Sequence, residues 1–162
     1  MATVHLFKET GVMEGASGKI IEEADGTVVK KVHRHLKQRA KCHGAQKQCE
    51  IQQWAARLLT PENGFTILYA PRAWITQKQQ QHEYSMEKIH CVEEVAPAEV
   101  AELKLFYARA KEVGIFPCDY ELYRQPDGRV AMIDFDKFAA WKGDAVEFPW
   151  GMVWAAPIYP WS

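Results

Sequence analysis

Two carboxylates near the middle of the second half of the chain have a spacing that suits acid–base chemistry. Asp119 and Glu121 are two positions apart, so their side chains share a face wherever the backbone is extended. Neighbouring carboxylates can share a proton or a cation, because repulsion between like charges raises one of their pKa values. The structural alternative is that both accept hydrogen bonds from backbone or from Arg124.

A third carboxylate, Asp134, directly follows the apolar run Val130 to Ile133. A charged group in that position must reach solvent in a cleft or meet a partner. Asp134 is therefore a candidate for binding or catalysis. The competing interpretation is an aspartate that caps a turn.

Cations gather earlier in the chain, where Lys30 to Cys49 contains seven Lys and Arg residues and no Asp or Glu. Such a stretch could bind a phosphate-rich ligand or form a solvated loop. It also holds His33, His35, Cys42, His43 and Cys49. Their spacing matches no familiar zinc motif and they lie among cations, so no zinc is expected.

Two predicted hairpins carry Lys30 and Asp134, which are candidate functional residues. Asp25-Gly26 separates the β-branched runs Gly18–Glu22 and Thr27–Val32, which places Lys30 in a strand. Gln125–Gly128 separates a second pair of strands, and the later of these ends just before Asp134. A lysine and an aspartate are thus delivered by hairpins that lie far apart in sequence.

Helices and further strands are expected to complete one sheet-containing domain. Apolar residues recur at helical spacing over Gln46–Leu59 and over Ala98–Val113, where Pro97 suits the first turn and Gly114 the end. Phe65–Tyr69 and Tyr84–Ile89 are predicted to be extended, and the glutamine-rich Thr76–His82 to be a loop.

Composition limits the class of protein. The chain has 162 residues, 48% of them hydrophobic and 25% charged, with a net charge of -1, which predicts a single globular domain over residues 1–162. The near-zero charge disfavours nucleic acid as a partner. The longest apolar stretch is interrupted by prolines, so no membrane partner is expected. The four cysteines form no CxxC pair and no apolar leader is present, which favours a cytoplasmic location.

Several motifs, taken in order, resemble the protein kinase fold. Met13-Glu-Gly15-Ala-Ser-Gly18-Lys-Ile20 looks like the glycine-rich loop, with Met13 in place of the first glycine. Val28-Val29-Lys30 resembles the strand that carries the phosphate-pairing lysine, with Lys31 as the competing choice. Glu50 lies where that family has the glutamate that pairs with this lysine.

The resemblance continues through the remaining cleft motifs. Tyr84 to Ile89 looks like the strand and hinge whose backbone faces adenine, which implies cofactor binding at Met86 and Glu87. Met132-Ile133-Asp134-Phe135-Asp136 resembles the metal-binding Asp-Phe-Gly, with Asp136 replacing the glycine. In that family the aspartate ligates magnesium, so Asp134 becomes the implied metal ligand.

The chain also departs from the kinase pattern. Glu121 stands at the position that resembles the catalytic-loop asparagine, and His-Arg-Asp is absent, which leaves Asp119 as the nearby candidate base. Only 28 residues follow Asp134, far fewer than a helical lobe needs. Asp119-Tyr-Glu121 and Ile133-Asp-Phe-Asp-Lys137 also look like motifs of small fungal kinase-like domains.

The resemblance implies an α+β fold with a kinase-like small lobe, an antiparallel sheet plus one helix over about residues 1–90. A helix and a catalytic-loop-like hairpin over 91–140 would be the vestige of the large lobe, and 141–162 an aromatic, proline-rich tail.

The expected function is that of a minimal kinase-like protein that binds a nucleotide, with ATP and Mg as the implied cofactors and phosphotransfer as the activity. Two alternatives stay open. One is an inactive, pseudokinase-type binding module with a protein partner, and the other is a different enzyme whose cleft carboxylates act as general acid or base on a small molecule. The tail tryptophans, Trp141, Trp150, Trp154 and Trp161, either cover the sheet or a pocket, or form a homodimer surface.

Overall fold

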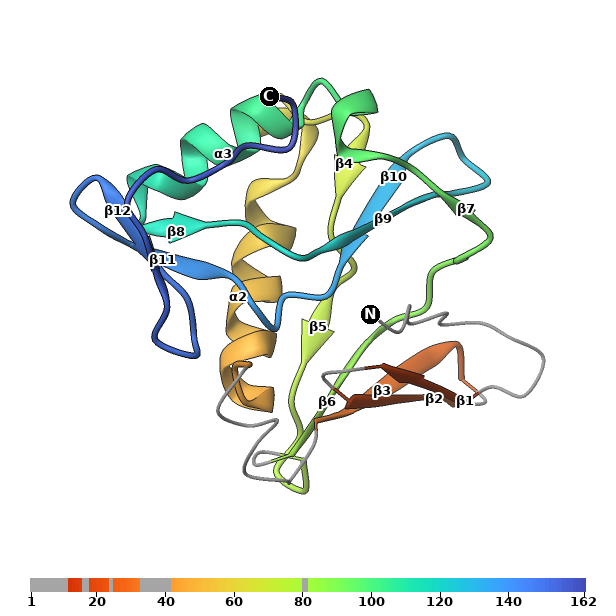
Figure 1. Ribbon diagram of the computed structural model, residues 1–162. Coiled ribbons are helices and arrows are strands. Elements are labelled where there is room, and N and C mark those ends of the chain that lie inside the picture. The colour runs from red at the N-terminus through yellow and green to blue at the C-terminus, as the bar shows by residue number, and fades with distance from the viewer. Residues whose placement is uncertain (1–11, 16–17, 24, 33–41, 80–81) are drawn as a thin grey trace.

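The computed structural model describes residues 12–15, 18–23, 25–32, 42–79 and 82–162. This part of the chain forms three small sheets, two α-helices and two short 3₁₀ turns (Figure 1). The expected α+β class is therefore confirmed. The tip of the glycine-containing turn, residues 16–17, and most of the basic stretch, residues 33–41, lie outside the described residues.

The first sheet is antiparallel and orders its strands β1–β2–β3–β6–β5. The strands are β1 (Val12–Gly15), β2 (Gly18–Glu22), β3 (Thr27–Val32), β5 (Ala73–Trp74) and β6 (Glu83–Glu87). The predicted β2–β3 hairpin is present, and its turn suits the sequence because Gly26 adopts a φ of 85°. The predicted strand Tyr84–Ile89 is displaced toward its N-terminus, and β5 was not foreseen.

Helix α2 (Ala45–Leu58) connects the two hydrophobic cores of the molecule. Its first half buries Ala45 and Cys49 in the core beneath the first sheet. Its second half buries Ile51 and Ala55 in the larger core. The helix predicted over Gln46–Leu59 is thus confirmed to within one residue at each end, and it fixes the first sheet against the rest of the protein.

The second sheet has the order β4–β10–β9–β7 and contains the second predicted hairpin. The strands are β4 (Leu68–Tyr69), β7 (Glu93–Glu94), β9 (Glu121–Arg124) and β10 (Val130–Ile133). Every residue of β10 is buried, because the strand runs between β4 and β9 and lies in the core. The extended run predicted over Phe65–Tyr69 is reduced to the two residues of β4.

Helix α3 (Leu103–Glu112) is shorter than the predicted Ala98–Val113. Pro97–Glu99 forms a separate 3₁₀ turn, and Val100 then has extended backbone with φ −108° and ψ 96°. Glu102 Oε1 and Oε2 accept hydrogen bonds from the backbone N–H groups of Thr66, Ile67 and Leu68, so this glutamate joins the start of α3 to the entry of β4. Gly114 ends the helix as predicted, with a φ of 78°.

The third sheet, with the order β13–β12–β11–β8, was not predicted. Its strands are β8 (Ile115–Phe116), β11 (Ala139–Lys142), β12 (Ala145–Glu147) and β13 (Val153–Trp154). The end of the tail packs on α3, where the Trp161 ring centroid lies 4.9 Å from that of Tyr107. Trp154 packs edge-on against Phe148 and remains partly exposed. The aromatic tail therefore covers α3 and the third sheet.

Candidate functional site

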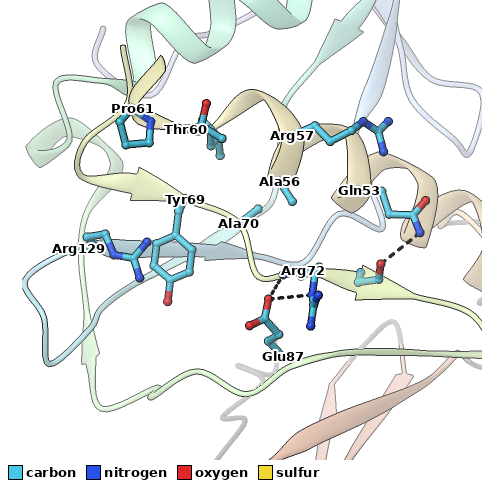
Figure 2. Close-up of a pocket in the computed structure, with 12 residues that line it drawn as sticks. Gln53, Ala56, Arg57, Thr60, Pro61, Tyr69, Ala70, Arg72, Glu87 and Arg129 are labelled. Atoms are coloured by element: carbon cyan, nitrogen blue, oxygen red, sulfur yellow. Dashed lines mark hydrogen bonds and ion pairs between the residues drawn. The ribbon is translucent and has the colours of Figure 1, made fainter. Parts of the chain in front are cut away.

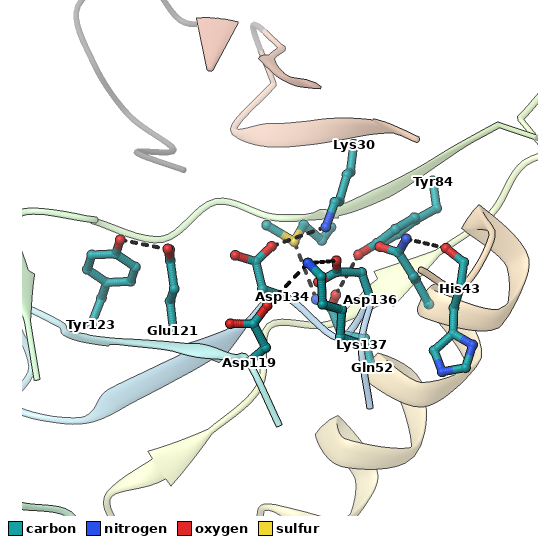
Figure 3. Close-up of polar contacts among 12 residues, drawn as sticks. Lys30, His43, Gln52, Tyr84, Asp119, Glu121, Tyr123, Asp134, Asp136 and Lys137 are labelled. Carbon is teal, nitrogen blue, oxygen red and sulfur yellow. Dashed lines mark hydrogen bonds and ion pairs between the residues drawn. The ribbon is translucent and has the colours of Figure 1, made fainter. Parts of the chain in front are cut away.

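The two predicted hairpins bring Lys30 and Asp134 together. Lys30 Nζ lies 3.1 Å from Asp134 Oδ1, and the exposed fractions of the two side chains are 3% and 11% (Figure 3). Alternation along β3 turns Lys30 into the protein and leaves Lys31 exposed. The lysine that faces the site is therefore Lys30.

The loops that carry two of the carboxylates have backbone conformations that L-residues rarely adopt. Asp134 has a φ of 69° and Asp119 a φ of 55°, and they are the only non-glycine residues with positive φ in the described part of the chain. Such conformations cost roughly 1–3 kcal/mol each and cluster at functional sites. Both strained residues contribute a carboxylate to the same charged cluster.

Lys137 connects Asp119 to the loop that follows β10. Its Nζ lies 3.2 Å from Asp119 Oδ2 and 2.9 Å from Asp136 Oδ2 (Figure 3). The charged cluster thus consists of Lys30, Lys137, Asp119, Asp134 and Asp136, with each lysine paired to at least one carboxylate.

The pairing determines the ionisation of this cluster. Burial by itself opposes the charge on Lys30, but the Asp134 carboxylate raises the pKa of the lysine well above its ordinary value. Burial raises the pKa of Asp134 despite the attraction of Lys30. Asp136 is also buried, yet Lys30 and Lys137 lower its pKa. The cluster therefore holds both lysines in their charged form.

A layer of neutral polar side chains lies behind the cluster. Tyr84 pairs with Lys30 across β6 and β3, and its hydroxyl donates to Gln52 Oε1 at 3.1 Å. The Gln52 amide in turn donates to the Pro71 carbonyl at 3.0 Å. These bonds fix the sheet residue beside Lys30 to helix α2.

A second connection runs from α2 to the loop that carries Asp136. Gln48 Nε2 donates to the His43 carbonyl at 2.6 Å, and the His43 backbone N–H donates to the Asp136 carbonyl at 2.7 Å. The side chain of Gln48 is fully buried, and its Oε1 has no hydrogen-bond partner among the described residues. The helix therefore presents a glutamine in its buried face rather than a carboxylate.

The structure does not bring Glu50 to Lys30. Glu50 is exposed and accepts a hydrogen bond from Gln46 Nε2 at 3.3 Å, one turn earlier on the helix. The predicted ion pair is wrong because Glu50 lies just outside the buried face of α2, which includes Gln48, Cys49 and Gln52. Asp134 is the carboxylate that pairs with Lys30.

The expected adenine-facing segment lies inside the first sheet and the linker after it. The Met86 side chain is buried and contacts Gln52 Nε2 through its sulfur. Backbone N–H groups of Glu87, Lys88 and His90 already donate to Arg72 O, Gly26 O and Gln125 Oε1. An adenine ring could use these three donors only by displacing the chain's own acceptors.

Asp119 and Glu121 do not behave as the shared-face pair that extended backbone would make. The positive φ of Asp119 breaks the extension before β9 begins at Glu121. Asp119 binds Lys137, whereas Glu121 accepts a hydrogen bond from the Tyr123 hydroxyl at 2.9 Å. Arg124 donates to the Gly128 carbonyl, so the described contacts do not make it the partner of either acid.

The remaining predicted ligands are only partly described. Gly15 and Gly18 face each other across β1 and β2, while the residues between them lie outside the described part. The same is true of His33 and His35 in the cation-rich stretch. His43 binds the Phe138 carbonyl through Nε2 at 2.7 Å. Among the described residues, no three His, Cys, Asp or Glu side chains are grouped to hold a metal ion.

The donor set of the cluster nevertheless fits magnesium held jointly with phosphate. Asp134 uses Oδ1 for Lys30, and its Oδ2 has no hydrogen-bond partner within the described chain. Magnesium in phosphotransfer sites is typically held by one or two carboxylates together with substrate phosphates. Asp134 and Asp119 are the residues that could supply such oxygens.

Three residues of this site were not predicted from the sequence, namely Lys137, Gln52 and Tyr84. The motif Ile133-Asp-Phe-Asp-Lys137 contained a signal for Lys137, because a lysine beside two aspartates is a natural counter-ion. Tyr84 could be found only from the register of β3 and β6, in which it pairs with Lys30.

Comparison of the chain with protein-family models, with curated proteins and with solved structures finds no match. Among the helices that the structure describes, none is both long and apolar enough to cross a membrane.

Proposed function

We propose that this chain is a minimal kinase-like protein that binds Mg-ATP at the charged cluster and transfers a phosphoryl group. One observation carries the proposal, namely the buried contact of 3.1 Å between Lys30 Nζ and Asp134 Oδ1. Lys30 comes from the first hairpin and Asp134 follows the second. A lysine and an aspartate from separate strands are the pair that phosphate and magnesium binding requires in the family that the sequence resembles.

The surrounding architecture supports the same proposal. An antiparallel sheet and one packed helix hold Lys30, in agreement with the small lobe that the resemblance implies. The catalytic-loop-like part is a short hairpin, β9 and β10, followed by Asp134. Both elements are anchored to α2, so the two charges are held in fixed positions before a ligand arrives.

Each charged residue would have a separate role. Lys30 and the glycine-containing turn would bind phosphate oxygens, and magnesium, when bound by Asp134, would neutralise charge on the phosphates. Asp119 would accept the proton of an acceptor hydroxyl as the hydroxyl oxygen bonds to the γ-phosphorus and the bond to the leaving ADP oxygen breaks. Lys137, which lies beside Asp119, would stabilise negative charge that develops during transfer.

A second candidate function, ligand binding without turnover, is favoured by other contacts. Lys137 neutralises Asp119 at 3.2 Å, which makes this carboxylate a weaker base. Three backbone N–H groups in the expected hinge are already hydrogen-bonded within the chain. A pseudokinase-type module would keep the Lys30 and Asp134 pair for binding and need no acceptor base.

Turnover and binding separate these candidates. The activity assay measures release of ADP from Mg-ATP, and a thermal shift on addition of Mg-ATP measures binding. Phosphotransfer predicts that Asp119→Asn lowers turnover by about 100-fold, within the range ascribed to general-base catalysis, while the thermal shift persists. A thermal shift with no turnover in the wild type would support the binding module. Absence of both at millimolar Mg-ATP would overturn phosphotransfer and nucleotide binding at the Lys30 cluster.

A further inference from the structure

A second charged region lies away from the Lys30 cluster, between the C-terminal half of α2 and the start of β10 (Figure 2). Three arginines, Arg57, Arg72 and Arg129, line a cavity of about 600 Å³ that we call the arginine groove. This volume is within the range of roughly 300–1,000 Å³ that small-molecule sites occupy. None of Lys30, Asp119, Asp134 or Asp136 lines it.

Two of the arginines are held in place by the protein. The Arg129 guanidinium lies over the ring of Tyr69 (Figure 2), 4.1 Å from its centroid. The Arg129 Nε also binds Asp127 Oδ2 at 2.8 Å. Arg72 Nε lies 3.5 Å from Glu87 Oε1, which also accepts the Arg72 backbone N–H at 3.0 Å. Stacking and pairing fix the guanidinium planes, so binding a ligand orders less of each side chain.

The third arginine supplies charge that the protein leaves unbalanced. Arg57 is exposed in the last turn of α2, and its guanidinium has no ion-pair or hydrogen-bond partner within the described chain. Glu87 is the one carboxylate among the lining residues, and Asp127 lies outside the lining. The three arginines therefore face two carboxylates, Glu87 in the lining and Asp127 just outside it, which leaves one positive charge in excess.

The wall between the arginines is mainly apolar, with Gln53 and Thr60 as its uncharged polar members. Ala56, Leu59, Ala70 and Ala73 line the groove together with Pro61. Tyr69 adds an aromatic surface that also supports Arg129. A ligand that matched this lining would combine a doubly charged anion with a small flat or apolar group.

We propose that the arginine groove binds a small phosphate monoester through Arg72 and Arg129, with Arg57 adding positive charge at the edge of the groove and the organic group against the apolar wall. Guanidinium groups suit phosphate because their parallel N–H donors match two phosphate oxygens at once. The arginine groove is separate from the Lys30 cluster, although Glu87 belongs both to its lining and to the segment expected to face adenine.

Phenyl phosphate is a suitable probe, because it joins a phosphate to a flat ring. Isothermal titration of the full chain at low salt should show one saturable site for this probe. Benzoate, with a single negative charge, should bind about tenfold more weakly, and phenol should not bind, because the phosphate supplies most of the affinity. Equal affinity for phenol and phenyl phosphate would contradict the proposal.

Two substitutions of opposite charge effect test the assignment. Arg57→Gln should weaken phenyl phosphate binding by about five- to tenfold, and Glu87→Gln should strengthen it by about two- to fivefold, because the latter removes the competing carboxylate. Arg109→Gln is the matched control, since Arg109 is an exposed arginine that pairs with Glu112 on α3. An equal loss in Arg57→Gln and Arg109→Gln would indicate only a general effect of net charge and overturn the assignment.

A third variant separates this site from the Lys30 cluster. Asp134→Asn, which alters the proposed nucleotide site, should leave phenyl phosphate affinity unchanged. If that variant changes the affinity while Arg57→Gln does not, the probe binds the Lys30 cluster and the arginine groove is not a phosphate site. Failure of Mg-ATP to bind the wild type would not affect this result.

Discussion

The Lys30 cluster and the arginine groove show two ways in which one chain places cations. In the cluster, Lys30 and Lys137 are at least partly buried, and each lies within 3.2 Å of a carboxylate. In the groove, the arginines are exposed and the described structure gives Arg57 no partner. Burial therefore accompanies complete pairing, whereas exposure accompanies an excess of positive charge.

This difference follows from the cost of removing a charge from water. A buried lysine without a carboxylate would lose its proton or destabilise the fold, so Lys30 and Asp134 must be present together. Exposed arginines remain hydrated and can keep unbalanced charge at little cost. A ligand at the cluster must consequently compete with buried ion pairs, whereas a ligand at the groove displaces water and competes only with exposed ion pairs.

The largest effect on stability is expected when one member of the buried pair is removed. Lys30→Met should lower the free energy of unfolding by about 3–5 kcal/mol, because it leaves Asp134 buried and unpaired. Lys31→Met, the neighbouring exposed lysine, should change it by less than about 0.5 kcal/mol. Urea denaturation followed by circular dichroism measures both. Equal effects would mean that Lys30 is hydrated rather than paired.

The double variant Lys30→Met/Asp134→Asn tests the same pair, because asparagine tolerates the left-handed backbone of residue 134. Removing both charges should restore most of the stability lost in Lys30→Met, since no buried carboxylate remains without a partner. A double variant as unstable as the single one would show that packing, and not charge, explains the loss.

A smaller effect is expected from the neutral layer behind the cluster. Tyr84→Phe removes the hydroxyl that donates to Gln52 Oε1 and leaves that buried oxygen without this donor. The expected loss is about 1–2 kcal/mol in urea denaturation. Tyr159→Phe, at a half-buried residue of the tail, is the comparison and should lower the free energy of unfolding by less. No loss in Tyr84→Phe would mean that water replaces the hydroxyl.

The sequence predicts part of this site and leaves other parts open, for physical reasons. Period-two alternation in Thr27–Val32 and the apolar run before Asp134 depend on nearest neighbours, and they identified Lys30 and Asp134 as candidate residues, although the partner predicted for Lys30 was Glu50. The choice between Glu50 and Gln48 on α2 required the rotation of the helix against the sheet. The polar Gln48 and Gln52 are both buried, so a stripe of apolar residues could not fix that rotation.

The same distinction applies to the fold. Hairpins and helices with strong local signals were predicted within a few residues. The strands β8, β11, β12 and β13 contain two to four residues each, too few for a visible alternation. Pairing of Lys137 with Asp119 depends on the left-handed backbone of Asp119, which no local rule at a non-glycine residue predicts.

The stability of the fold is expected to depend on pH through His43, which lies just before α2. Burial lowers the pKa of His43 below its ordinary value, which is about 6.5. As the pH falls below that value, the unfolded chain takes up a proton more readily than the native protein, so stability falls. His43→Gln should flatten the dependence of unfolding free energy on pH below about 6.5. An unchanged slope would exclude His43 as its source.

The smallest effect on stability is expected in the groove. Arg129→Gln should alter the free energy of unfolding by no more than about 0.5 kcal/mol, because its contacts with Asp127 and Tyr69 are at the surface. Urea denaturation in low and high salt measures this change. A loss as large as that of Lys30→Met would remove the contrast between the two regions.

Calorimetric titration with Mg-ATP is the most direct test of nucleotide binding by Lys30 and Asp134. We expect one saturable binding event in the wild type and in Lys31→Met. Asp134→Asn should lose most of the affinity at a temperature where circular dichroism shows it to be folded, because the loss of the partner of Lys30 lowers stability. Wild-type protein that gives no heat at millimolar Mg-ATP, or equal binding in all three proteins, would contradict the assignment of Lys30 and Asp134 as a nucleotide site.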